Sequence, residues 1–132
     1  MEDIAVDMVV LEYDRYVLVM LYGELDIYTG RDLREQLTCL AGGTDRPVII
    51  DMAGVPFCDG SAQAILLATE RRARSQGHSI ALIGLTPQVH KVFRLTGLTL
   101  ALPVCMTLRE AQWCVLPLSD TEIEAALGQG PC

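Results

Sequence analysis

The chain has 132 residues, of which 51% are hydrophobic and only 5% aromatic, and its formal net charge at pH 7 is −7. A chain of this length forms one domain, here with a mostly aliphatic core. Its acidic balance argues against nucleic-acid binding and against an anionic membrane surface, because both require a basic patch. The acidic start at Glu2 and Asp3 is unlike a secretory signal. No apolar run reaches the roughly 18 residues of a membrane span, so we expect a cytoplasmic protein.

The first part of the chain predicts two strands, a helix and a third strand. Residues 6–12 and 16–23 are rich in β-forming side chains and are close enough to form a hairpin. Thr29 is a predicted N-cap for a helix with apolar residues at helical spacing, which Gly42 and Gly43 end. Residues 47–51 (PVIID) are continuously apolar up to the final acid, which is typical of a strand buried on both faces.

The rest of the chain continues to alternate between helix and strand. The predicted elements are a helix over 61–76, a strand over 79–83, a helix over 86–95, a strand over 100–104 and a helix that begins after Thr107 and carries Trp113. This order predicts an α/β domain over residues 1–117, with a mixed sheet of about four to five strands and helices packed on one side. For residues 118–132 we expect a tail with one short helix over 123–127 and then disorder.

Two polar turns follow predicted strands. Gly23-Glu24-Leu25-Asp26 follows the second strand, and Asp59-Gly60-Ser61 follows the third. Sites in open α/β sheets gather outside the carboxyl ends of strands, so both turns are candidate sites. Spacing alone also permits a purely structural role, since Asp26, Asp59 and Ser61 are residue types that cap helices.

The catalytic residue types do not gather around Ser61. A nucleophilic serine needs a base, and His78 lies beyond the far end of the following helix, about 25 Å away at 1.5 Å per residue. There is no glycine-rich phosphate loop, and the five cysteines form no CxxC pair. We expect no enzymatic activity, no cofactor and no metal site. A redox switch among the cysteines and a small-ligand-binding α/β domain stay open as alternatives.

The helix after Ser61 predicts a protein-binding surface. The residues that share its sheet-facing side are Ala62, Ile65, Leu66, Thr69 and Ala73. Ala64, Leu67 and Ala68 then point partly outward beside the polar turn. An exposed apolar strip next to a hydroxyl that can be modified suits a protein partner. The alternative is that a neighbouring helix covers this strip.

Four stretches in the chain carry a family resemblance. They are GELD at 23–26, PVIID at 47–51, VPFCDGSA at 55–62 and GLTPQVHKVFRLTGL at 84–98. In this order and at these separations they resemble the STAS-domain anti-sigma-factor antagonists of bacteria, over about residues 5–115. The resemblance implies a small α/β domain that acts by partner switching. In such systems an anti-sigma kinase holds either a sigma factor or the antagonist, and it phosphorylates the antagonist on a serine that a phosphatase later restores.

The resemblance also implies roles for individual residues. The family's usual stretch is Asp-Ser-Ser-Gly, with the phosphate on the second hydroxyl residue; the run from Asp59 to Ala62 places that acceptor at Ser61. Asp59 matches the neighbouring acid and Asp26 the acid of the first turn. Two positions depart from the pattern, because Gly60 replaces a hydroxyl residue and Ala62 replaces a glycine.

We therefore predict a cytoplasmic, non-enzymatic anti-sigma-factor antagonist that is switched off by phosphorylation at Ser61. Its partners are an anti-sigma factor of the serine-kinase type and a candidate PP2C-type phosphatase, with no nucleic acid and no membrane. The predicted partner-binding residues are Asp26, Asp59, Gly60, Ser61, Ala64, Leu67 and Ala68. The alternatives are a STAS module of another system, such as a stressosome-like or lipid-transport accessory component, or a diverged antagonist that is not phosphorylated.

Overall fold

The computed structural model describes residues 7–25 and 30–116, which form one sheet surrounded by helices. The five strands lie in the order β1 to β5, which confirms the predicted mixed α/β fold. β1 (Asp7–Glu12) pairs antiparallel with β2 (Val17–Tyr22), as the hairpin predicts. The remaining neighbours are parallel; they are β3 (Val48–Gly54), β4 (Ile80–Ile83) and β5 (Val104–Cys105).

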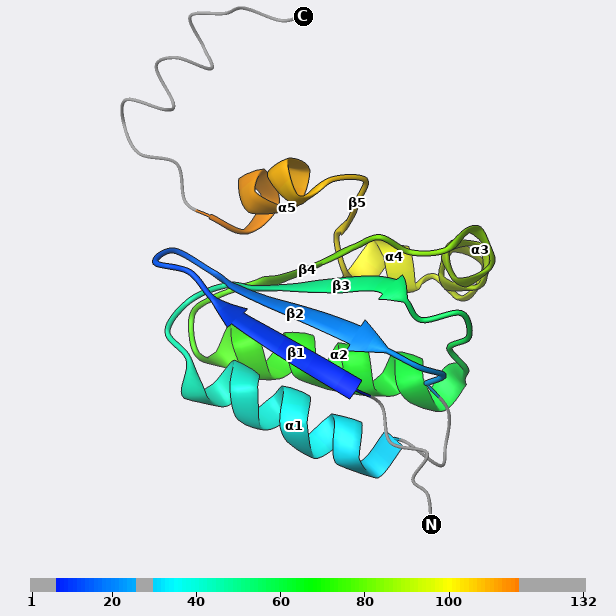
Figure 1. Ribbon diagram of the computed structural model, residues 1–132, viewed down its shortest axis with the longest axis horizontal. Coiled ribbons are helices and arrows are strands. Elements are labelled where there is room, and N and C mark those ends of the chain that lie inside the picture. The colour runs from blue at the N-terminus through cyan, green and yellow to red at the C-terminus, as the bar shows by residue number, and fades with distance from the viewer. Residues whose placement is uncertain (1–6, 26–29, 117–132) are drawn as a thin grey trace, which may run out of the picture.

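Two long helices cover the first face of the sheet (Figure 1). They are α1 (Gly30–Gly43) and α2 (Gly60–Ser75). The predicted inward side of α2 is buried along its length, from Ala62 to Ala73. These side chains join the larger core with alternate strand residues such as Val19, Ile50 and Leu82. α3 (Pro87–Thr96) adds Val89 and Phe93 to the same core.

Among the described helices, one, α5 (Leu108–Val115), packs on the second face (Figure 1). Its Ala111 and Val115 meet the opposite set of strand residues, including Leu18, Ile49 and Ala81. The predicted placement of helices on one side therefore holds for α1 and α2 and is corrected for α5. The physical reason is that the central parallel strands are apolar on both faces, and a second cover must keep water from them.

The segment after α3 also differs from the prediction. Residues 100–104 were expected to form a strand, but Leu98–Ala101 form one helical turn, α4, and β5 contains two residues. Gly97 turns the chain with a φ of 83°, which a residue with a side chain rarely adopts. Leu98 and Leu102, spaced by four, are both buried, and Pro103 then forces Leu102 into an extended conformation.

Several sequence predictions fall outside the described residues. They concern Asp26, the helix cap at Thr29 and the tail over 118–132 with its short helix. Within the described ranges, no helix is both long and apolar enough to cross a membrane.

Candidate functional site

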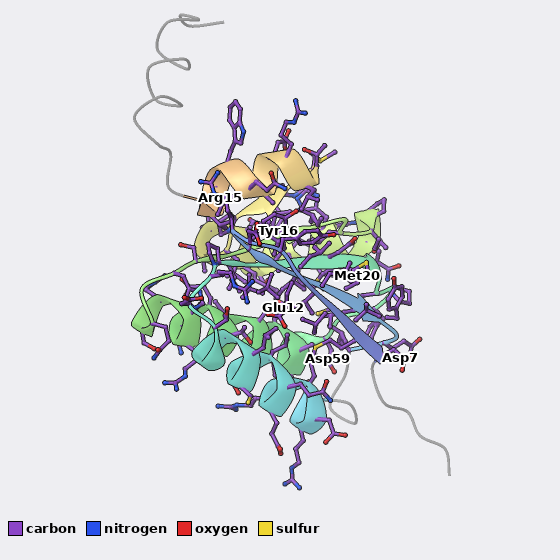
Figure 2. The ribbon with its side chains drawn as sticks, turned by 60° about the vertical axis from the view of Figure 1, so that its left-hand side comes forward. Asp7, Glu12, Arg15, Tyr16, Met20 and Asp59 are labelled. Atoms are coloured by element: carbon purple, nitrogen blue, oxygen red, sulfur yellow. The ribbon has the colours of Figure 1, made fainter. Side chains whose placement is uncertain are left out.

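The two predicted polar turns lie side by side at the carboxyl ends of β2 and β3. The Leu25 N–H donates to the Phe57 carbonyl at 3.0 Å, and the Asp59 N–H donates to the Leu25 carbonyl at 3.1 Å. This parallel bridge between Leu25 and Cys58 holds the GELD segment against the start of α2. Asp59 lies at the opposite end of the sheet from Arg15 of the β1–β2 turn (Figure 2).

Asp59 is the N-cap of α2. Its backbone is extended, and its Oδ1 accepts hydrogen bonds from the N–H groups of Ser61 at 3.0 Å and Ala62 at 3.1 Å. These are donors that the first turn of a helix otherwise leaves without partners. The sequence did not decide whether Asp59 or Ser61 caps the helix, and in the structure the N-cap is Asp59. Ser61 becomes the second residue of the helix.

The Ser61 hydroxyl is exposed and points to the same carboxylate. Ser61 Oγ donates to Asp59 Oδ1 at 2.6 Å, a distance typical of a strong hydrogen bond to an ionised acceptor. One carboxylate oxygen therefore caps the helix and orients the hydroxyl. The hydroxyl oxygen keeps its lone pairs for an incoming electrophile, and the carboxylate lies where the hydroxyl proton would go.

The outward side of α2 forms the predicted strip. Ala64 is exposed, while Leu67 and Ala68 are half-buried. Ala64 lies between two surface hollows. The first, of about 510 Å³, lies between α1 and α2 and includes Ser61. The second, of about 290 Å³, lies between α2 and α4 and includes Gly60 and Leu67. Ser61 and the apolar strip thus belong to one continuous surface.

Sequence reasoning did not identify two cations that share a hollow with Ser61. Arg31 and Arg34 of α1 line the same hollow as Ser61 and Ala64, together with the acidic Glu35. Arg31 lies in the first turn of α1, where the positive end of the helix dipole disfavours a cation. An arginine at this unfavourable position can be seen in the sequence. The packing of α1 against α2, which places it in the hollow with Ser61, cannot.

Gln63 is a third residue that the sequence reasoning did not identify. It is 8% exposed on α2, and its Oε1 accepts a hydrogen bond from Thr96 Oγ1 at 2.7 Å. This bond ties α2 to the end of α3. It holds the floor of the smaller hollow in place.

Cys58 lies directly beneath the Asp59 cap. It is buried in the larger core. Burial, and then the negative charge of Asp59, raise the pKa of the Cys58 thiol to about 12. The thiol is therefore protonated at neutral pH and acts as a small apolar side chain rather than a nucleophile.

Neither histidine contacts this site. His78 lies past the other end of α2, where its Nε2 is 3.0 Å from the Ala41 carbonyl, and His90 lies within α3. Ser61 thus has a carboxylate but no imidazole in contact with it. In the described part of the chain, no group of three or more His, Cys, Asp or Glu side chains is arranged to hold a metal ion.

The fold and this turn define a STAS-type domain with a hydroxyl at the start of its second helix. The family model described as "Mlab, STAS domain" matches residues 11–104, so the chain belongs to the STAS domain family.

Similar proteins include anti-sigma factor antagonists. The anti-sigma-B factor antagonist of Staphylococcus aureus (strain NCTC 8325 / PS 47) is 25% identical over 85 residues, which cover 64% of this chain and 79% of that protein. Two solved structures share the fold. An anti-sigma factor antagonist from Mycobacterium paratuberculosis has a TM-score of 0.74 at 23% identity, covering 83% of this chain and 93% of that one. SpoIIAA in its unphosphorylated form has a TM-score of 0.66 at 21% identity, covering 92% and 97%.

Proposed function

We propose that this protein is an anti-sigma-factor antagonist that binds an anti-sigma factor of the serine-kinase type and is switched off by phosphorylation of Ser61. The observation that carries the proposal is the exposed Ser61 hydroxyl, held 2.6 Å from the Asp59 carboxylate at the start of α2. The names of its relatives support an anti-sigma factor as the partner, since several are anti-sigma-B factor antagonists.

The switch follows from the charges around Ser61. Phosphorylation replaces the hydroxyl proton with a phosphate group that carries about −1.5 to −2 charges. Ser61 can then no longer donate a hydrogen bond to Asp59, and the phosphate and the carboxylate repel each other. The fold tolerates this charge because it lies at a helix N-terminus and because the hollow that Ser61 lines contains two arginines, Arg31 and Arg34, against one acid, Glu35. A partner that covers the surface must instead desolvate it. A loss of about 3–4 kcal/mol would weaken binding a few hundredfold.

The binding surface has an apolar part and a polar part. Ala64, Leu67 and Ala68 supply contact area, and Asp59, Gly60 and Ser61 supply the polar end. Gly60 is exposed, and an added Cβ there would meet nothing within 4 Å, so a partner can approach the backbone closely. The protein would act in the cytoplasm without a catalytic step of its own, and a PP2C-type phosphatase would reverse the modification.

The test combines mass and affinity. The protein is incubated with its anti-sigma kinase and ATP, and its intact mass is compared with that of Ser61→Ala. We expect one phosphate on the wild type and none on the variant. Ser61→Glu should also weaken binding to the kinase at least tenfold, since even one carboxylate adds charge beside Asp59.

Ser75 provides the matched control, because it is an exposed serine at the other end of α2. Ser75→Glu should bind as tightly as the wild type. A phosphate that still appears on Ser61→Ala would refute the site. Wild-type affinity in Ser61→Glu would refute the charge mechanism. Intact binding with no phosphate on the wild type would favour a diverged antagonist, in which Gly60 and Ala62 have removed kinase recognition.

A further inference from the structure

Two cysteines meet where β5 joins α5. Cys105 ends β5 and is buried, while Cys114 is exposed in the last turn of α5. Their Sγ atoms lie 3.5 Å apart, which is within hydrogen-bonding distance for sulfur. A disulfide has an S–S distance of about 2.05 Å, so bond formation needs an approach of about 1.5 Å. Cys114 can make this approach, because it is exposed and lies in the last turn of α5.

We propose that Cys105 and Cys114 are a redox-sensitive pair that forms a reversible disulfide when the protein meets hydrogen peroxide. The site lies on the second face of the sheet, away from α1 and α2. It therefore does not depend on the proposed role of Ser61.

Among the four cysteines in the described residues, the environments single out this pair. Cys58 is buried in the larger core, and burial with the charge of Asp59 raises its pKa to about 12. Cys39 is exposed on α1, on the other side of the sheet. Cys114 combines exposure to solvent with a second thiol at contact distance. A reactive cysteine beside a resolving cysteine is the usual arrangement of a thiol sensor.

The chemistry is a two-electron oxidation. The Cys114 thiolate attacks one oxygen of hydrogen peroxide, the O–O bond breaks, and hydroxide leaves to give a sulfenic acid. Cys105 then attacks the sulfenic sulfur; the S–S bond forms, and the sulfenic oxygen leaves as water with the Cys105 proton. Burial, the contact with Cys114 and the charge of Glu110 raise the pKa of Cys105 to about 11, so Cys105 is not the thiol that reacts first with peroxide. Its part in the second step rests on proximity, because its Sγ lies 3.5 Å from that of Cys114. A dithiol reductant reverses the bond by exchange.

The bond would restrain α5. This helix is attached to the sheet mainly through Ala111 and Val115. A covalent link from Cys114 to β5 closes a short ring around the Thr107 cap and fixes the far end of the helix. We expect slower amide exchange over residues 108–115 after oxidation and no change in α2.

The sequence permits a direct test by peptide mapping. Arg109 lies between the two cysteines, so trypsin separates them into peptides 95–109 and 110–132. Cys132 falls in the second peptide, and the experiment therefore uses a Cys132→Ser background. The reduced full chain is treated with hydrogen peroxide, alkylated and digested. The expected product is the two peptides joined, with the mass of their sum less two hydrogens, and dithiothreitol should release them.

Variants separate the pair from general oxidation. Cys114→Ser should abolish the joined peptide completely, and Cys39→Ser should leave its yield unchanged. Cys105→Ala serves as the partner variant, because alanine adds no polar group to the buried site; circular dichroism checks that it folds. Cys114 should then accumulate as sulfenic acid. The proposal is overturned if peroxide gives only singly oxidised cysteines in the Cys132→Ser protein, or if the joined mass persists when Cys114→Ser is added to it.

Discussion

The two faces of the sheet are built differently. The first is covered by α1 and α2, with α3 adding side chains to the same continuous core. The second is covered by α5 over the β3–β5 side, while Val9, Leu11 and Tyr22 at the β1–β2 side are exposed. The first face therefore provides a rigid base for α2 and for Ser61 at its start. The second face depends on a few contacts of one short helix, and it carries the cysteine pair.

The largest expected difference is between core truncations on the two faces. Leu66 is fully buried under α2, and Leu66→Ala should lower the free energy of unfolding by about 2–5 kcal/mol. Val115 of α5 is 7% exposed, and Val115→Ala should cost about 1–2 kcal/mol, from two methyl groups at about 0.8 kcal/mol each. Urea denaturation measures both. Equal losses would show that the second face is as tightly integrated as the first.

Cys58 makes the first face sensitive to alkaline pH. Its pKa is about 12 in the folded protein against an ordinary value of 9.0. Because folding favours the neutral thiol, its contribution to stability is complete below pH 9.0 and declines as pH rises towards 12. The decline is up to about 1.4 kcal/mol per pH unit.

The measurement is the fall in unfolding free energy between about pH 8 and about pH 10, which lie on either side of the ordinary thiol pKa. Cys58→Ala should show a shallower fall than the wild type. Cys39→Ala, at an exposed position on α1, should match the wild-type slope. A Cys58→Ala slope equal to that of the wild type would contradict the assigned cause.

The helix caps provide a finer comparison of the two faces. Asp59 accepts two backbone N–H groups at the start of α2, whereas Thr107 accepts the Glu110 N–H at the start of α5. We expect Asp59→Ala to cost about 1–2 kcal/mol and Thr107→Ala about 0.5–1 kcal/mol. Asp59→Asn keeps the acceptor and should recover most of the loss. A larger cost at Thr107, measured by thermal unfolding, would reverse the ranking of the faces.

The smallest expected effect is a gain in stability at Gly60. An added Cβ there meets nothing within 4 Å, and the residue does not have a positive φ, so Gly60→Ala should stabilise the fold by about 0.4–1 kcal/mol. Gly84→Ala is the opposing control. Gly84 has a φ of 73°, and its Cβ would lie 2.5 Å from Asp51 Oδ1, so stability should fall. A loss at Gly60 would indicate that the turn before α2 needs the freedom of glycine.

Local features of the chain were predictable because their causes lie within a few residues. The helix periodicity of α2, the start of a helix after Thr107 and the apolar strand β4 each follow from neighbouring side chains, and the structure confirms them. The outward strip around Ala64 follows from the same periodicity. The single helical turn of α4 was missed, because two leucines spaced by four are too short a signal beside a β-rich run.

The sequence by itself determined the order of elements apart from α4, the inward side of α2 and the polar turn that carries Asp59 and Ser61. Tertiary structure alone decided which distant groups meet. The bridge between Leu25 and Cys58, the placement of Arg31 in the hollow with Ser61 and the pairing of Cys105 with Cys114 depend on strand register and helix docking. The reason is physical: a helix or cap is stabilised within one turn, whereas these placements join residues far apart in the chain and form only when the helices have packed on the sheet.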